Sequence, residues 1–263
     1  SFEDSYDGYI IATPSETHYT LSKKIISLGN NVLIEKPMTL SIEDAREIKL
    51  LSEKKNVSVM VGHVLLFHPA IKKIKEMINN NTIGNLQYIY SNRLNLGKIR
   101  MEENVFWSFA PHDIAIFQFL TDDYPINIQA SGSTFVQEGI HDLTMTNLEY
   151  SNGVKGHIFV SWLHPFKEHR LVVIGSEAMI VFEDSKNDKP LTLFSKKFDL
   201  STGIPEKIDG EVKQIIYDKK MPLEAELEYF LNHLDGKKPR VSNVSHGLDT
   251  VKILVNASKQ LIE

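Results

Sequence analysis

Short apolar runs alternate with amphipathic helical patterns over the first quarter of the chain. Three of the runs, at residues 9–12, 32–34 and 57–61, are typical of buried strands. Between them, apolar residues at helical spacing predict helices near 15–28 and 42–55. Short links between each strand, the next helix and the next strand imply right-handed crossovers, and therefore a parallel sheet.

After Gly62 the pattern changes to β-rich segments joined by turns. Proline at the first helical position predicts helices over 69–79 and 111–120, and two more helices, over 222–236 and 243–262, close the chain. Eight strands are predicted around these helices, at residues 86–94, 126–136, 143–150, 154–162, 170–174, 179–182, 191–194 and 212–217.

An Asn-Gly turn at residues 152–153 is a strong hairpin signal, and strands linked in this way form a mainly antiparallel sheet. The polar stretches 184–190 and 199–211 are predicted to be mobile loops. We therefore expect an α/β unit with a parallel sheet over residues 1–62. An α+β unit should follow over 63–263, with an open, mainly antiparallel sheet and flanking helices.

Polar groups follow the first two predicted strands at the point where each strand ends. Thr13 and Pro14 come after the first strand, and Glu35, Lys36 and Pro37 come after the second. The carboxyl ends of neighbouring parallel strands share one edge of an open sheet, and ligands bind at that edge. Lys36 is therefore placed to orient a substrate hydroxyl and to stabilise negative charge on oxygen. The alternative is a surface lysine in a loop.

The helix that begins after Thr13 and Pro14 carries His18. Amide groups at a helix N-terminus attract phosphate or ribose oxygens, which favours a cofactor site here. The alternative is an ordinary helix start with a solvated His18.

His112 is the candidate general base. Pro111 is predicted to place His112 and Asp113 in the first turn of a helix. Imidazole titrates near neutral pH and is suited to proton transfer. The alternatives are a buried, hydrogen-bonded histidine and, for Asp113, a charge that simply favours a helix N-terminus.

The segment 161–170 concentrates polar side chains between two predicted strands. Lys167 and Arg170, with Trp162 nearby, suit an anionic substrate, but they could equally be cross-strand surface charges. The histidines of the chain show no tight ligand spacing on one element, so we expect no metal site. The histidines considered are His112, His141, His164 and His169.

Composition narrows the class of protein. The net charge of −5 over 263 residues, without a basic block, argues against a nucleic-acid binder. The absence of cysteine excludes disulfides and thiolate chemistry and fits a cytoplasmic location. No apolar run reaches the roughly 20 residues of a membrane span. The chain starts without methionine or a signal peptide and enters a strand almost at once, so we expect its natural beginning to be absent.

Short motifs spread over nearly the whole chain form one ordered set. They are Ala12-Thr13-Pro14 with His18, Glu35-Lys36-Pro37, Val61-Gly62-His63 with Phe67 and Pro69, Ala110-Pro111-His112-Asp113, Ser161-Trp162 with Lys167 and Arg170, Gly175-Ser176, and Pro222-Leu223 with Glu226 and Phe230. Their order and spacing resemble the glucose-fructose oxidoreductase, inositol dehydrogenase and rhizopine-catabolism (Gfo/Idh/MocA) family of NAD(P)-dependent oxidoreductases.

The resemblance implies the C-terminal part of a Rossmann domain over 1–62, a substrate-binding and oligomerisation domain over 63–263, and NAD or NADP as cofactor. It implies that Lys36 contacts the reacting hydroxyl and the nicotinamide ribose, and that His112 is the acid/base. The implied cofactor-lining residues are Ala12, Thr13, Pro14, His18, Glu35, Lys36 and Pro37. The implied substrate residues are His63, Asp113, Trp162, Lys167 and Arg170.

Two departures from the family pattern matter. The Gly-x-Gly-x-x-Gly turn does not occur in the sequence, so the chain as written is expected to bind cofactor poorly. Ser108 stands where many family members carry an acidic residue, four positions before the catalytic histidine.

We expect an oxidoreductase that acts on a hydroxyl of a sugar, nucleotide sugar or cyclitol by hydride transfer. The alternative is a non-catalytic sugar-binding or oligomerisation module, which the absent phosphate loop and Ser108 would favour. A third hypothesis is metal-assisted hydrolysis by the histidines. An open sheet with one uncovered face also predicts a homodimer or homotetramer.

Overall fold

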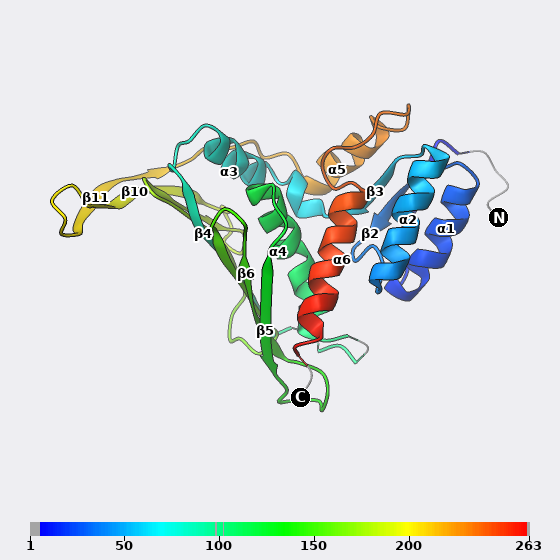
Figure 1. Cartoon of the computed structure of the whole chain (residues 1–263), viewed down its shortest axis with the longest axis horizontal. Coiled ribbons are helices and arrows are strands. Elements are labelled where there is room, and N and C mark those ends of the chain that lie inside the picture. Colours follow the sequence, from blue (N-terminus) through cyan, green and yellow to red (C-terminus); the bar gives the residue numbers. More distant parts are fainter. Residues whose placement is uncertain (1–5, 98, 102, 262–263) are drawn as a thin grey trace.

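Two sheets, one small and parallel and one large and mostly antiparallel, stand apart with helices between them (Figure 1). The computed structural model describes residues 6–97, 99–101 and 103–261. The predicted class, a Rossmann-like parallel sheet followed by a mainly antiparallel sheet with flanking helices, is confirmed.

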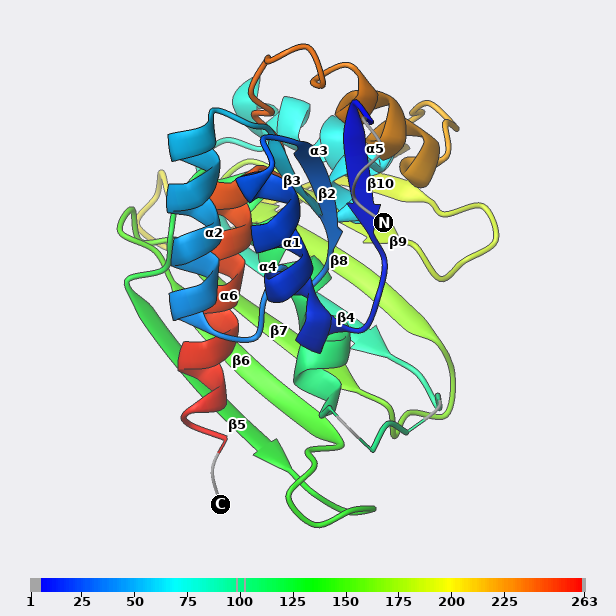
Figure 2. The same cartoon turned by 90° about the vertical axis from the view of Figure 1, so that its right-hand side faces the viewer.

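The small sheet has three parallel strands in the order β1-β2-β3. Its elements in chain order are β1 (Gly8–Ile11), the 3-10 turn η1 (Ser15–Thr17), α1 (His18–Ser27), β2 (Asn31–Glu35), α2 (Ile42–Lys55) and β3 (Val59–Gly62). The start of α2 follows from capping, because the Ser41 hydroxyl accepts a hydrogen bond from the amide of Asp44 at 3.0 Å. Figure 2 shows α1, α2 and α6 (Val244–Ser258) on one side of this sheet.

Strands β2 and β3 are buried on both faces, which explains why they are continuous apolar runs, whereas Ile10 of β1 is exposed. Val32, Ile34 and Val61 pack with α1, α2 and the first half of α6. Leu33 and Met60 point to the opposite face and join the core of the large sheet. Since α6 contributes to both cores, the division at residues 62 and 63 stays a prediction.

The large sheet has eight strands in the order β11-β10-β9-β8-β4-β7-β6-β5, and all neighbours are antiparallel except the parallel pair β4 and β7. Its strands are β4 (Leu86–Leu94), β5 (Asn127–Ser133), β6 (Leu143–Glu149), β7 (Lys155–Ser161), β8 (Glu168–Gly175), β9 (Met179–Glu183), β10 (Leu191–Asp199) and β11 (Glu206–Gln214). The helices α3 (Pro69–Asn79), α4 (Val105–Thr121) and α6 lie on one side of it, and the other side is uncovered (Figure 1).

The helix predicted over 111–120 begins six residues earlier, at Val105, so the position expected for His112 and Asp113 is wrong. The side-chain oxygen of Asn104 accepts a hydrogen bond from the amide of Trp107 at 3.1 Å and caps α4 there. Pro111 lies inside the helix, where it forgoes one backbone hydrogen bond. His112 and Asp113 therefore lie in the middle of α4.

The loop predicted over 199–211 is largely a hairpin, because β10 extends to Asp199 and β11 begins at Glu206. Every residue of β11 is exposed, so this strand has no apolar alternation that would reveal it. The hairpin projects from the body of the protein (Figure 1). The stretch 184–190 does connect two strands, and its mobility stays a prediction.

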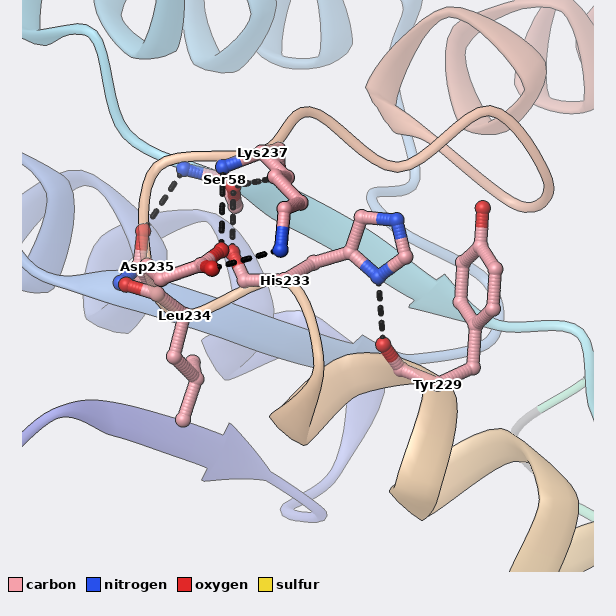
Figure 3. A network of polar contacts seen from close by, with 7 residues as sticks. Ser58, Tyr229, His233, Leu234, Asp235 and Lys237 are labelled. Atoms are coloured by element: carbon pink, nitrogen blue, oxygen red, sulfur yellow. Dashed lines mark hydrogen bonds and ion pairs between the residues drawn. The ribbon is translucent and has the colours of Figure 1, made fainter.

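The helix predicted over 222–236 is shorter, because α5 (Pro222–Leu231) gives way to turns that tie it to the small sheet (Figure 3). The Ser58 hydroxyl, just before β3, lies 3.1 Å from the carbonyl oxygens of both His233 and Lys237. The Asn31 amide donates to the carbonyl of Leu234 at 3.2 Å. The last helix ends at Ser258, and residue 262 of its predicted range lies outside the described residues.

Candidate active site

The candidate site lies at the carboxyl edge of the small sheet, where β2 and β3 end side by side. Glu35 pairs with Gly62 in the sheet register, so Lys36 and His63 follow at the same edge. The peptide between Lys36 and Pro37 is cis. This edge faces α4, which carries the second half of the site.

Lys36 joins the small sheet to α4. Its Nζ donates a hydrogen bond to the carbonyl oxygen of Ser108 at 3.1 Å. Burial lowers the pKa of the Lys36 ammonium below its ordinary value. Because residues four apart lie on one face of a helix, Ser108 and His112 share the face of α4 that meets Lys36. The first predicted pair, Lys36 and His112, is thus brought together.

His112 is partly buried, and its Nδ1 is enclosed without a hydrogen-bond partner in the described part of the chain. Burial, followed by the nearby charges of Lys36 and Arg93, holds the pKa of His112 well below its ordinary value. The imidazole is therefore neutral near pH 7 and can accept a proton.

His63 has the same character. It is 1% exposed, and among the described residues neither ring nitrogen has a hydrogen-bond partner. Burial, together with His246 and Lys36, lowers its pKa to about 3. A neutral imidazole offers one donor and one acceptor, and both are enclosed here, so the substrate contact expected of His63 stays a prediction.

The residues predicted to line a cofactor range from exposed to buried, with Glu35 and Lys36 half-buried. Ala12, Thr13 and Pro14 are exposed at the end of β1. His18 is 1% exposed and not solvated, because its ring nitrogens lie 2.8 Å from the carbonyl oxygen of Pro37 and 2.9 Å from that of Thr13. His18 thus joins the loops that follow β1 and β2, and it positions the cofactor-binding candidates relative to one another.

The segment 161–170 does not converge on Lys36 and His112 as a group. Trp162 is 1% exposed, and its indole N–H donates to the carboxylate of Asp142. Lys167 is exposed in the connection before β8. Arg170 alternates to the outer face of the sheet and pairs with Glu183 at 3.3 Å. Substrate contacts by Trp162, Lys167 and Arg170 stay predictions.

Asp113 is 2% exposed and turned towards β4, where its carboxylate forms an ion pair with the guanidinium of Arg93. The sequence did not point to Arg93, and it pointed to His169 on β8, which lies beside Arg93, only as a possible metal ligand. A usable signal was present, since Arg93 occupies the same alternating face of β4 as the buried Ile89 and Ser91. A charged side chain at such a position implies a buried partner.

The described residues contain no group of three or more His, Asp or Glu side chains arranged to hold a metal ion. In the same part of the chain, no helix is both long and apolar enough to cross a bilayer.

Residues 2–63 match the family model described as an oxidoreductase family with an NAD-binding Rossmann fold, and residues 71–181 match the GFO/IDH/MocA C-terminal domain. An uncharacterized oxidoreductase of Streptococcus pneumoniae is 30% identical over 193 residues, which are 67% of this chain and 52% of that protein. The chain thus spans about half the length of that relative.

A UDP-N-acetylglucosamine 3-dehydrogenase of Acidithiobacillus ferrooxidans is 25% identical over 234 residues, 89% of this chain and 72% of that protein. A solved structure of that bacterium's enzyme superposes with a TM-score of 0.85 at 22% identity, covering 98% of this chain and 79% of its own. A levoglucosan dehydrogenase in complex with NADH and levoglucosan has a TM-score of 0.83 at 18% identity, with coverage of 98% and 80%. These structural likenesses show the fold. The two matched family models show that this chain belongs to the GFO/IDH/MocA family of oxidoreductases.

Proposed function

We propose that the protein is a dehydrogenase that transfers hydride between a hydroxyl-bearing carbon of a sugar, nucleotide sugar or cyclitol and NAD or NADP. The observation that carries the proposal is the junction of Lys36 with α4. The Lys36 ammonium lies 3.1 Å from the carbonyl oxygen of Ser108, and the neutral imidazole of His112 lies one helical turn later on α4. An ammonium beside a neutral base is the pair that oxidation of an alcohol requires.

In this proposal Lys36 orients the substrate hydroxyl and stabilises the negative charge that grows on its oxygen. His112 takes the hydroxyl proton as the carbon–hydrogen bond breaks, and it returns a proton in the reverse direction. His63 holds a second hydroxyl of the same substrate through its unpartnered ring nitrogens. When bound, NAD or NADP supplies the hydride acceptor.

The residues at the sheet edge fit a nicotinamide cofactor. The strand end at Ala12, Thr13 and Pro14 is exposed, and Glu35 follows the neighbouring strand. Pro37 and His18 hold the two loops together through the hydrogen bond at 2.8 Å. Because parallel strands deliver these groups to one edge, they form a surface on which ribose and nicotinamide can lie.

The rival function is a sugar-binding or oligomerisation module without catalysis. A binding module needs hydrogen-bond partners for its ligand, but it has no need for a neutral base beside a desolvated ammonium. The low pKa of His112 and the burial of Lys36 therefore favour the dehydrogenase.

The test replaces Lys36 by methionine in the protein expressed from its complete gene. Lys36→Met should lower kcat by on the order of 10² to 10³, because charge stabilisation in the transition state is lost. The KM values for cofactor and sugar should change little. Lys54→Met, at an exposed position on α2, is the matched control. Wild-type turnover in the Lys36→Met variant would remove Lys36 from the mechanism.

We also propose that the uncovered face of the large sheet binds a second copy of the chain, giving a homodimer or a homotetramer. Tyr90 and His157 stack on this face with ring centroids 5.0 Å apart, and Phe159 lies two residues further along β7. A broad face with such side chains is typical of subunit interfaces. Tyr90→Glu should lower the mass measured by light scattering, whereas Leu50→Glu on α2 should not. A wild-type monomer at all concentrations would refute the proposal.

The cytoplasmic location also stays a proposal from composition. Cell fractionation with an antibody to the native protein tests it.

A further inference from the structure

A buried ion pair connects α4 to β4 directly beside the candidate base. The Arg93 Nε donates to Asp113 Oδ2 at 2.7 Å, and Nη2 donates to Asp113 Oδ1 at 3.1 Å. The two residues are 9% and 2% exposed. Two parallel hydrogen bonds fix both the distance and the orientation of the groups, which one contact would not do.

Asp113 directly follows His112 in the middle of α4, so the pair holds the same helical turn that carries the candidate base. The remaining Arg93 nitrogen, Nη1, lies 3.3 Å from Nδ1 of His169 on β8. A cavity of about 20 Å³ adjoins Arg93, Asp113 and His169, which is room for one water molecule. Arg93 therefore connects the His112 turn to two strands of the large sheet.

Stability alone does not explain this pair. Two buried charges lose hydration energy that their mutual attraction only about offsets, so apolar residues of similar volume often serve as well. The other flank of His112 lacks a side-chain carboxylate, because Ser108 stands one turn earlier and contributes its backbone carbonyl to Lys36. The pair with Arg93 is thus a charged restraint on this turn that is made through two hydrogen bonds.

We propose that Arg93 is a positioning residue for the dehydrogenase reaction. By pairing with Asp113, Arg93 fixes the turn of α4 that carries His112, and it keeps a cation beside the His112 imidazole. The inference rests on the proposed function, in which His112 is the base. It assigns Asp113 to this positioning task, so that the Asp113 carboxylate acts on Arg93 instead of on substrate.

Several charged or titratable groups face His112 from the surrounding elements, and Arg93 is one of several that act on the pKa of His112. They are Lys36 after β2, His63 after β3, Arg93 on β4 and His169 on β8. Asp113, the next residue of α4, is paired with Arg93. Asp184 acts on Arg93 and His169, and His246 on α6 acts on His63. Arg93 is among the cations that lower the pKa of His112, after burial and Lys36. Its removal should therefore raise that pKa.

The test follows the His112 imidazole by NMR titration, with its resonance identified by its loss in His112→Gln. Three proteins are compared with the wild type. Arg93→Lys keeps the charge but loses the paired hydrogen bonds. The double variant Arg93→Met with Asp113→Leu replaces both charges by apolar groups and should stay folded. Lys75→Met removes an ion pair with Asp122 at the far end of α4 and is the matched control.

Arg93→Lys should leave the His112 titration within a few tenths of a pH unit and lower kcat by about tenfold at unchanged KM, since geometry alone is lost. The double variant should raise the His112 pKa, because the Arg93 cation no longer acts on the imidazole, and should lower kcat at least as much. The Lys75→Met control should change neither. A double variant that melts, titrates and turns over like the wild type would overturn the inference. If the wild type oxidises no sugar, the proposed function fails, while the titration still decides whether Arg93 acts on His112.

Discussion

Glu226 provides a sharp prediction about stability, because it is a carboxyl group buried without a partner. It lies on α5, is 0% exposed, and neither of its oxygens has a hydrogen-bond partner among the residues described. Burial, followed by repulsion from Glu35, raises the pKa of Glu226 from 4.5 to about 8. The folded protein therefore keeps this proton at pH values where the unfolded chain has lost it.

The sign of the effect on stability follows from this difference. Below pH 4.5 both states are protonated, and the carboxyl costs nothing extra. As pH rises towards 8, the unfolded state binds fewer protons than the folded state, so the free energy of unfolding falls. Each pH unit in this window removes about 1.4 kcal/mol. At pH 7 the loss is roughly 3 kcal/mol, a large share of the stability of an ordinary domain.

Glu226→Gln removes the ionisable group and keeps its size. The difference in unfolding free energy between Glu226→Gln and wild type should therefore grow in favour of the variant by roughly 2.5 kcal/mol between pH 5 and pH 7, and should level off above pH 8. Urea denaturation at a series of pH values measures it, compared at equal m values. Glu224→Gln, at an exposed position of the same helix, is the control and should give a flat difference. A pH-independent difference for Glu226→Gln would refute the reasoning.

Three further predictions concern the site. Ser108→Asp places a carboxylate one turn before His112 and should raise the pKa of His112 by a unit or more. The pH below which kcat/KM falls lies well below 6.5 in the wild type, and it should rise together with the pKa of His112. Gly62→Ala would bring a Cβ to 2.8 Å from the Glu35 carboxylate, so the KM for cofactor should rise several-fold while the sugar KM is unchanged. His18→Leu loses the hydrogen bonds to the loops that follow β1 and β2, so it should lower the free energy of unfolding, measured by urea denaturation, by about 2 kcal/mol. An unchanged free energy of unfolding would contradict the role of His18 in joining these loops.

The parallel sheet and its helices were readable from the sequence because local signals agree there. Continuous apolar runs marked β2 and β3, and Ser41 with Asp44 marked the start of α2. The start of α4 was misjudged because Pro111 is a familiar first residue of helices, whereas the cap at Asn104 precedes an apolar stretch without obvious periodicity. The start of β11 was placed six residues too late, at residue 212, because the exposed, charged residues at its beginning carry no apolar alternation.

The sequence indicated Lys36 and His112 as candidates, because Lys36 follows a recognisable strand and His112 lies on a recognisable helix. It could not show the pairing of Arg93 with Asp113 or the burial of Glu226, because both depend on contacts between residues far apart in the chain. Arg93 pairs with Asp113, which lies 20 positions later in the chain. Glu226 is repelled by Glu35, which lies far from it in the sequence. A single sequence contains the charges but not the distances between them.

The central claim, hydride transfer at the edge that holds Lys36 and His112, has a direct test. The protein expressed from its complete gene is mixed with NAD or NADP and a panel of sugars, nucleotide sugars and cyclitols deuterated at their hydroxyl-bearing carbons, and the cofactor is analysed by mass spectrometry. The account predicts that one class of substrate transfers its deuterium to the nicotinamide, and that Lys36→Met abolishes the transfer without abolishing binding. Sugar binding with no deuterium transferred from any member of the panel would contradict the account and favour the non-catalytic module.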